Sequence, residues 1–182
     1  MVRIHVKHGC RRAVNGADGE LEFLYDCETS STIQHITQDI TEIANFQLQI
    51  RQLGYQLLPP VAALLHTHRP QVIALHRALS EATSYASKEQ VVHGKPLSIL
   101  VLRDHIRIIE TEFVVNYKLL NFQDSNFEQL LSDLELLQEA TVQLLWAGKE
   151  LMKGKTLRDY IGKNEKTKIM LRLQSQVSNP AC

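Results

Sequence analysis

The sequence predicts an α+β fold that is predominantly helical, and two changes of periodicity carry this prediction. Near the amino terminus apolar and polar residues alternate, which is the two-residue period of a half-buried strand. After Ser31 the apolar residues recur every three or four positions, which is the period of a helix with one buried face. A hydrophobic fraction of 44% supplies a core, and a charged fraction of 22% argues against disorder.

The first two elements are expected to form a β-hairpin. Apolar and charged residues alternate in VRIHVK at residues 2–7 and in ELEFLYD at residues 20–26. The stretch between them contains Asn15-Gly16 and Asp18-Gly19, and such pairs readily adopt the positive φ of a turn.

A long helix should follow the hairpin. Ser31 and Gln34 have the spacing of a capping box, and Gly54 and the LLPP stretch at residues 57–60 are expected to end the helix. Its predicted buried face contains Ile33, Ile36, Ile40 and Ile43. Strand, strand and long helix in this order resemble the opening of a ubiquitin-like β-grasp, which would need a further strand to complete its sheet.

Three more helices are expected in the remainder of the chain. Apolar periodicity predicts one helix over residues 72–82 and another over residues 99–113, although EFVVNYKLL at residues 112–120 also fits a strand. The last helix is expected to begin at a capping box of Ser125 and Glu128 and to end at Gly154.

These elements suggest three domain ranges. Residues 1–58 form the hairpin and helix unit, residues 59–154 the helical region, and residues 155–182 a basic docking segment.

Composition and charge narrow the classes of function. The formal net charge is zero, so neither nucleic acid nor an anionic membrane is an expected partner. Cys10, Cys27 and Cys182 are too widely spaced for a disulfide framework or a zinc site. The start of the chain lacks the apolar run of a signal peptide, and a soluble intracellular protein is therefore expected.

Two motifs could suggest chemistry and are better explained otherwise. GKELMKGKT at residues 148–156 has five residues between its glycines, whereas a phosphate-binding loop has four. Instead, Gly154 is expected to end a helix, and Thr156 to begin the next one in a capping box with Asp159. His66 and His68 stand two residues apart, so on a helix they would point away from one another, and no third metal ligand is near them in the sequence. Neither a catalytic set nor a metal site is predicted.

The end of the chain has a segregated charge pattern. Residues 119–148 contain five acidic residues and no Lys or Arg, whereas residues 149–172 contain eight basic residues. The basic part either folds back on the acidic part, or is merely a solvated surface, or is a docking surface for an acidic protein. Trp146 is either a core residue or an interface anchor.

The stretch DYIGKNEKTKI at residues 159–169 resembles the signature of the Kurly family, cilia- and flagella-associated protein 298. In that signature the run follows a helix end that contains a tryptophan, the place of Trp146 here. MVRIHVKHG at residues 1–9, LPP at residues 58–60 and KEQVVHG at residues 88–94 are similar to the family in the expected order. The middle of the chain is shorter and more apolar than in the family, as in a shortened, divergent paralogue.

The resemblance implies a protein of motile cilia that is not an enzyme and needs no cofactor. The implied role is an adaptor or assembly factor for axonemal dynein arms, present in the cytoplasm and the motile cilium, with partners from the dynein-assembly machinery or the axoneme. A stably bound structural subunit of the axoneme is the alternative, and a nucleotide-binding protein that uses the lysine-rich loop is the alternative from the enzyme class. The residues expected to contact a partner are Trp146, Asp159, Tyr160, Ile161, Gly162, Lys163, Asn164, Lys166 and Lys168.

Overall fold

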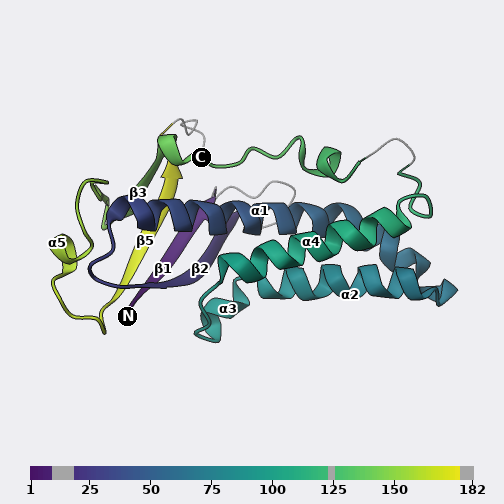
Figure 1. Ribbon diagram of the computed structural model, residues 1–182, viewed down its shortest axis with the longest axis horizontal. Coiled ribbons are helices and arrows are strands. Elements are labelled where there is room, and N and C mark those ends of the chain that lie inside the picture. Colours follow the sequence, from purple (N-terminus) through teal and green to yellow (C-terminus); the bar gives the residue numbers. More distant parts are fainter. Residues whose placement is uncertain (10–18, 123–125, 177–182) are drawn as a thin grey trace. The chain divides into compact units, whose positions relative to one another are not determined.

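A computed structural model describes residues 1–9, 19–122 and 126–176, and it confirms a mixed α+β fold with a large helical part (Figure 1). In chain order the elements are β1 (Val2–Gly9), β2 (Glu20–Cys27), α1 (Ile33–Leu64), η1 (Leu65–Thr67), α2 (Pro70–Tyr85), α3 (Glu89–Val92), α4 (Ile99–Asn116), η2 (Phe127–Leu131), η3 (Glu139–Thr141), β3 (Val142–Trp146), β4 (Lys149–Glu150), α5 (Arg158–Ile161) and β5 (Lys168–Ser175).

The chain forms two compact units. The first contains the described residues of Met1–Asn45, Ser87–Leu97 and Leu137–Cys182, and the second those of Phe46–Ala86 and Ser98–Leu136. Helix α1 contributes its beginning to the first unit and its remainder to the second. The domain ranges 1–58, 59–154 and 155–182 stay a prediction.

The first unit is built on a five-stranded sheet with the strand order β2-β1-β5-β3-β4. Strands β1 and β5 are parallel, and the other neighbours are antiparallel. This strand order and these strand directions are those of a ubiquitin-like β-grasp. The further strands that β1, β2 and α1 needed to complete such a sheet are β3, β4 and β5, near the end of the chain. The helices between α1 and β3 form an insertion into that arrangement.

The predicted hairpin is confirmed, since β1 and β2 pair antiparallel from Val2↔Cys27 to Gly9↔Glu20. Asn15, Gly16 and Asp18, which were expected in its turn, lie outside the described residues.

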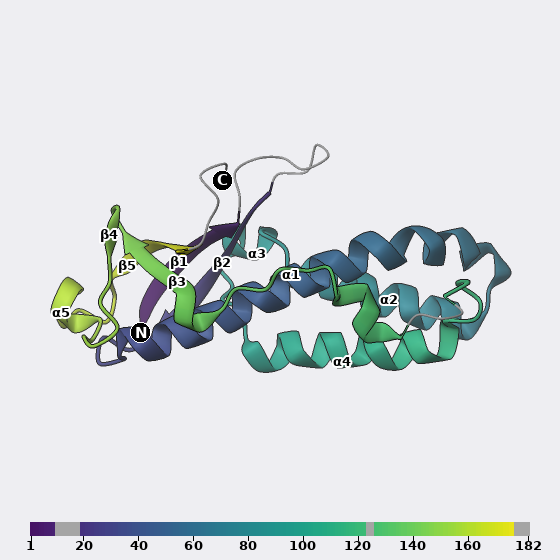
Figure 2. The same cartoon turned by 90° about the horizontal axis from the view of Figure 1, so that it is seen from above.

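The core of this unit lies between one face of the sheet and the beginning of α1, which crosses the strands in Figure 1 and lies on one side of them in Figure 2. Alternation places every second side chain of β1 on this face, and the predicted helix face meets it. The buried side chains of this core include Val2, Ile4, Val6, Phe23, Ile33, Ile36, Ile40, Ile43, Val142, Leu144, Leu171 and Leu173.

Helix α1 begins later and ends later than predicted. Its amino-terminal cap is Thr32, whose hydroxyl accepts a hydrogen bond from the backbone N–H of His35 at 3.2 Å, rather than Ser31 with Gln34. Pro59 and Pro60 lie inside the helix. Because proline has no N–H group, the carbonyls of Tyr55 and Gln56 lack their usual helical partners at these two positions.

Gly54 does not end the helix. It lies inside α1, at a site of close helix packing within the second unit. A Cβ atom at Gly54 would lie 2.7 Å from Cγ2 of Thr83 in α2, which is closer than Cβ atoms approach their neighbours. Glycine therefore lets α1 and α2 approach more closely there than any larger residue would.

The second unit also contains α2 and α4, which pack against each other. Their bounds are close to those of the two helices that the periodicity predicted over residues 72–82 and 99–113. The alternative of a strand over residues 112–120 is wrong, since α4 continues to Asn116. The amide of Asn116 donates hydrogen bonds to the carbonyl oxygens of Gln71 in α2 and Glu112 in α4, which fastens the end of α4 to α2.

The prediction of a helix from Ser125 to Gly154 is wrong. The segment begins with the short 3₁₀ helix η2, whose capping box joins Asn126 and Gln129, while Ser125 lies outside the described residues. It then continues without a long helix to β3, so Trp146 lies in a strand. The leucine spacing fits a helix, but the buried Val142 and Leu144 also alternate with less buried residues, as in a strand. Pairing with β5 supplies hydrogen-bond partners for the backbone of this strand.

Candidate functional site

The predicted partner-binding residues lie on the β3–β4 hairpin, on the connection from β4 to β5, and on the first residue of β5. We call residues 151–167, which contain α5, the β4–β5 loop. The hairpin turns at Ala147 and Gly148, both with positive φ (48° and 80°), as the right-handed twist of two-residue hairpins favours.

Asp159 holds the beginning of α5. Its carboxylate accepts hydrogen bonds from the backbone N–H and the hydroxyl of Thr156, at 2.8 and 2.9 Å. These hydrogen bonds lower the pKa of Asp159. The predicted pairing of Thr156 with Asp159 is therefore present, and it has a structural role within the loop.

The backbone of the same segment is bound to the connection between β2 and α1. Leu157 and Arg158 donate their N–H groups to the carbonyl oxygens of Ser31 and Thr29, at 3.0 and 2.8 Å. A phosphate-binding loop needs free N–H groups that point at the phosphate, and these are already used. In addition α5 is only one turn long, so the arrangement does not offer the nucleotide site that the glycines and lysines suggested.

Tyr160 lies against its own chain. Its hydroxyl oxygen accepts a hydrogen bond from the backbone N–H of Met152 at 2.8 Å, and Lys155 Nζ lies 5.5 Å from the centre of its ring. Ile161 is half-buried. Gly162 has φ 80° and ψ −164°, a combination that is essentially restricted to glycine.

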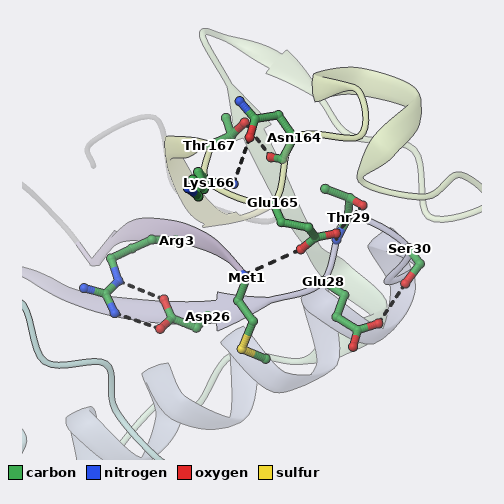
Figure 3. Close-up of polar contacts among 10 residues, drawn as sticks. All are labelled: Met1, Arg3, Asp26, Glu28, Thr29, Ser30, Asn164, Glu165, Lys166 and Thr167. Atoms are coloured by element: carbon green, nitrogen blue, oxygen red, sulfur yellow. Dashed lines mark hydrogen bonds and ion pairs between the residues drawn. The ribbon is translucent and has the colours of Figure 1, made fainter.

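Asn164 shapes the turn into β5, as the close-up in Figure 3 shows. Its side-chain oxygen accepts a hydrogen bond from the N–H of Lys166 at 3.0 Å, and its carbonyl accepts the hydroxyl of Thr167 at 2.7 Å. The three lysines 163, 166 and 168 are exposed. A partner could contact these exposed side chains.

Glu165 was not among the predicted residues, yet it connects the loop to residues near the start of the chain. Its carboxylate accepts hydrogen bonds from the N–H and hydroxyl of buried Thr29, at 2.9 and 2.5 Å, and lies 3.8 Å from the amino group of Met1 (Figure 3). The hydrogen bonds from Thr29 lower the pKa of Glu165. Because Thr29 is 136 residues away, no local pattern could have indicated this pair.

Trp146 belongs to a second surface, an open groove of about 420 Å³ that we call the sheet groove. The sheet groove is lined by Lys7 of β1, residues 145–148 of the β3–β4 hairpin and residues 170–172 of β5. None of the other predicted residues lines it. An alternating strand over residues 168–175, with Met170 on the outer face, was the signal in the sequence that could have indicated it.

No metal site emerges from the part of the chain that the structure describes, since nowhere do three His, Cys, Asp or Glu side chains gather. His66 and His68 are exposed, and the ring of His66 is hydrogen-bonded to the carbonyl of Ala63 at 2.8 Å. In the same described ranges, no helix is long and apolar enough to cross a membrane.

Fold and surfaces together define a mixed α+β protein of β-grasp arrangement with a helical insertion. A family model described as "Cilia- and flagella-associated protein 298" matches residues 142–182, which include every predicted site residue. The resemblance to that family is therefore confirmed, and similarity to its curated proteins extends over most of the chain.

Two proteins named cilia- and flagella-associated protein 298, from Rattus norvegicus and Danio rerio, are each 25% identical to the chain, over 97% of it and 77% of their own length. The protein of that name from Mus musculus is 33% identical over 56% of the chain and 39% of its own length. The alignment with the rat protein covers 232 positions, more than the 182 residues of this chain, so the relative has additional residues within it. No solved structure matches the chain significantly.

Proposed function

We propose that the chain is a non-catalytic cilium protein that acts as an adaptor or assembly factor for axonemal dynein arms, in the cytoplasm and the motile cilium. The observation that carries this proposal is the family match at residues 142–182, because it falls on the strands and the loop that contain the predicted docking residues. The names of the relatives place those proteins with cilia and flagella.

The geometry supports protein binding by this region rather than nucleotide chemistry. The N–H groups at the start of α5 are bound to the β2–α1 connection, so a phosphate would have to displace existing hydrogen bonds. Calorimetry with ATP and with GTP should accordingly detect no micromolar binding, and saturable binding that Lys155→Ala abolishes would reverse this part of the proposal.

Within the docking segment the residues divide into two groups. Asp159, Tyr160 and Asn164 make hydrogen bonds that shape the loop. Lys166 and Lys168 are exposed and can steer an acidic protein surface toward it. Charge reversal at these lysines should therefore slow association without unfolding the protein.

The experiment that tests the proposal is fractionation of ciliated cells that express the tagged chain, combined with affinity purification. An assembly factor should be found in the cytosolic fraction together with dynein-assembly proteins. A stably bound structural subunit should instead remain with the detergent-extracted axoneme. Absence from both the cilium and the dynein-assembly complexes would contradict the proposed function.

The double variant Lys166→Glu with Lys168→Glu should lose the co-purified partners while its melting temperature stays unchanged. Lys95→Glu, another exposed lysine of the first unit that lies outside the docking segment, is the matched control and should keep them. Equal recovery of partners by both variants would show that the basic residues are only a solvated surface.

A further inference from the structure

We propose that the sheet groove binds a protein segment that inserts a large apolar side chain beside Leu145 and Met170 and carries carboxylates next to it. The groove lies on the face of the sheet opposite the core, because the side chains of Lys7, Leu145 and Met170 alternate with buried neighbours along their strands. This proposal rests on the proposed function in one respect only, which is that both require the chain to bind a protein.

Strand register brings the lining together across three strands. Lys7 of β1 is paired with Arg172 of β5, and Arg172 is paired with Leu145 of β3. Met170 precedes Arg172 by two residues and therefore lies on the same face. The lining thus combines an apolar centre with two cations.

The centre of the groove has the composition of a protein interface. Met170 is 53% exposed and Leu145 is half-buried, so apolar area remains open to solvent. Methionine and arginine are enriched at protein interfaces, and anchors in a partly enclosed pocket supply most of the binding energy.

The charge of the lining selects an acidic partner. Lys7 and Arg172 are its two ionisable side chains, and both are cationic. The carboxylate of Glu22 is 2.8 Å from the ring of His5 and forms an ion pair with Lys7 Nζ at 3.9 Å, which is longer than a hydrogen bond. The ammonium group of Lys7 can therefore receive a carboxylate of the partner.

Arg172 has a different role. Its Nη1 is 2.6 Å from a carboxylate oxygen of Glu20, and its Nη2 donates to the carbonyl of Gly9 at 3.3 Å, so the guanidinium is held in place. A phosphate backbone is bound mainly by unpaired cations, and here one of the two cations is already paired while the centre is apolar. The groove consequently fits an acidic and apolar protein segment better than a nucleic acid.

The test is selection from a displayed library of random 12-residue peptides on the full chain, with the Met170→Asp variant as counter-selection. Peptides that bind wild type and not the variant should share a large apolar residue flanked by Asp or Glu. A synthetic peptide of the enriched sequence should change the fluorescence of Trp146, which is the only tryptophan of the chain and lines the groove. Met170→Asp should weaken its binding about tenfold or more.

Met152→Asp is the matched control, because Met152 is 57% exposed but lies outside the groove, and this variant should bind the same peptide as wild type does. Lys7→Glu should weaken binding at low salt and lose this effect as salt rises. Circular dichroism and thermal melts establish that each variant is folded.

Three outcomes would overturn the proposal. They are enrichment of basic or uncharged sequences, enrichment that Met170→Asp does not change, and a Trp146 response to a single-stranded RNA or to self-association instead of to the peptides. Failure of the ciliary fractionation alone would contradict the proposed function and leave the groove as an acidic-peptide site. Failure of the peptide selection alone would contradict the acidic-peptide site and leave the proposed function standing.

Discussion

The phenolic oxygen of Tyr160 accepts a hydrogen bond from the backbone N–H of Met152 at 2.8 Å. Met152 follows β4 and Tyr160 lies in α5, so this bond closes the first part of the β4–β5 loop on itself. The loop is further bound through Leu157 and Arg158 to the β2–α1 connection. A segment whose sequence suggested only a docking surface therefore also stabilises the fold.

Tyr160→Phe should lower the free energy of unfolding by about 0.5–1.5 kcal/mol, because it removes the acceptor and leaves the ring in place. The lower half of that range is expected, since Met152 is exposed and water can reach its N–H group. Urea unfolding followed by circular dichroism measures the difference.

The control is Tyr55→Phe, which alters a tyrosine that is 75% exposed and should stay within about 0.5 kcal/mol of wild type. If both variants were equally stable, the hydroxyl of Tyr160 would not be holding the loop.

Gly162→Ala should destabilise the protein by roughly 1–3 kcal/mol, because φ 80° with ψ −164° is a conformation that a residue with a Cβ atom rarely adopts. No heavy atom lies within 4 Å of a Cβ placed there, so the cost comes from the backbone conformation and not from a clash.

Gly154→Ala is the matched control for this substitution. Gly154 lies in the same loop with equally open space around it, but its φ is not in the positive range. This variant should be neutral or more stable by about 0.4–1 kcal/mol, because alanine restricts the unfolded chain. Thermal melts that order the two variants the other way would exclude the backbone explanation.

The hairpin and the buried face of α1 were predictable from the sequence because both depend on local periodicity, as Val2, Ile4 and Val6 and then Ile33 and Ile36 show. Strands β3 and β5 were not predicted. Their places depend on pairing with each other and with β1, which is far away in the sequence, and the leucine spacing before Trp146 also fits a helix.

The candidate site was predictable only in part for the same reason. The sequence located the segment and its exposed lysines, and the Thr156–Asp159 contact followed from a local capping rule. It could not show that Tyr160 would be bound to Met152, or that Trp146 would lie in a groove with Lys7 and Met170. Those contacts depend on the completed sheet.

Gly54→Ala tests the close approach of α1 and α2 within the second unit. Alanine is favoured over glycine in a helix by roughly 1 kcal/mol, so a helix without close neighbours would be stabilised. Here the new methyl group would lie 2.7 Å from Cγ2 of Thr83, and we expect net destabilisation, since overpacking costs about 1–3 kcal/mol.

Thr83→Ser supplies the compensating change for a double-mutant cycle. It removes Cγ2 and keeps the hydroxyl that donates to the carbonyl of Leu79 at 2.8 Å. The double variant should recover stability relative to Gly54→Ala, with a coupling of at least about 0.5 kcal/mol. Additive effects of the two substitutions on the urea midpoint would mean that the two residues do not meet.

Glu165→Gln tests the bond between the β4–β5 loop and Thr29 through its dependence on pH. Because Thr29 donates two hydrogen bonds to the carboxylate, the pKa of Glu165 in the folded protein lies below its ordinary value of 4.5. A carboxylate with a lowered pKa contributes stability that is present above its ordinary pKa and is lost as the pH falls through the folded pKa. The variant should therefore be less stable than wild type at pH 7, and the two free energies of unfolding should converge as the pH falls below about 4.5.

The convergence of the two curves is the decisive measurement, because the pKa values of Asp26 and Asp159 are also lowered and make both proteins less stable in acid. Urea unfolding at a series of pH values from 7 down to the acid limit of folding gives the two curves. Thr29→Val, which removes the hydroxyl donor and keeps the backbone one, should reduce the difference that Glu165→Gln produces at pH 7. A gap between wild type and Glu165→Gln that stayed constant over the whole pH range would show that the charge of Glu165 does not fasten the loop to Thr29.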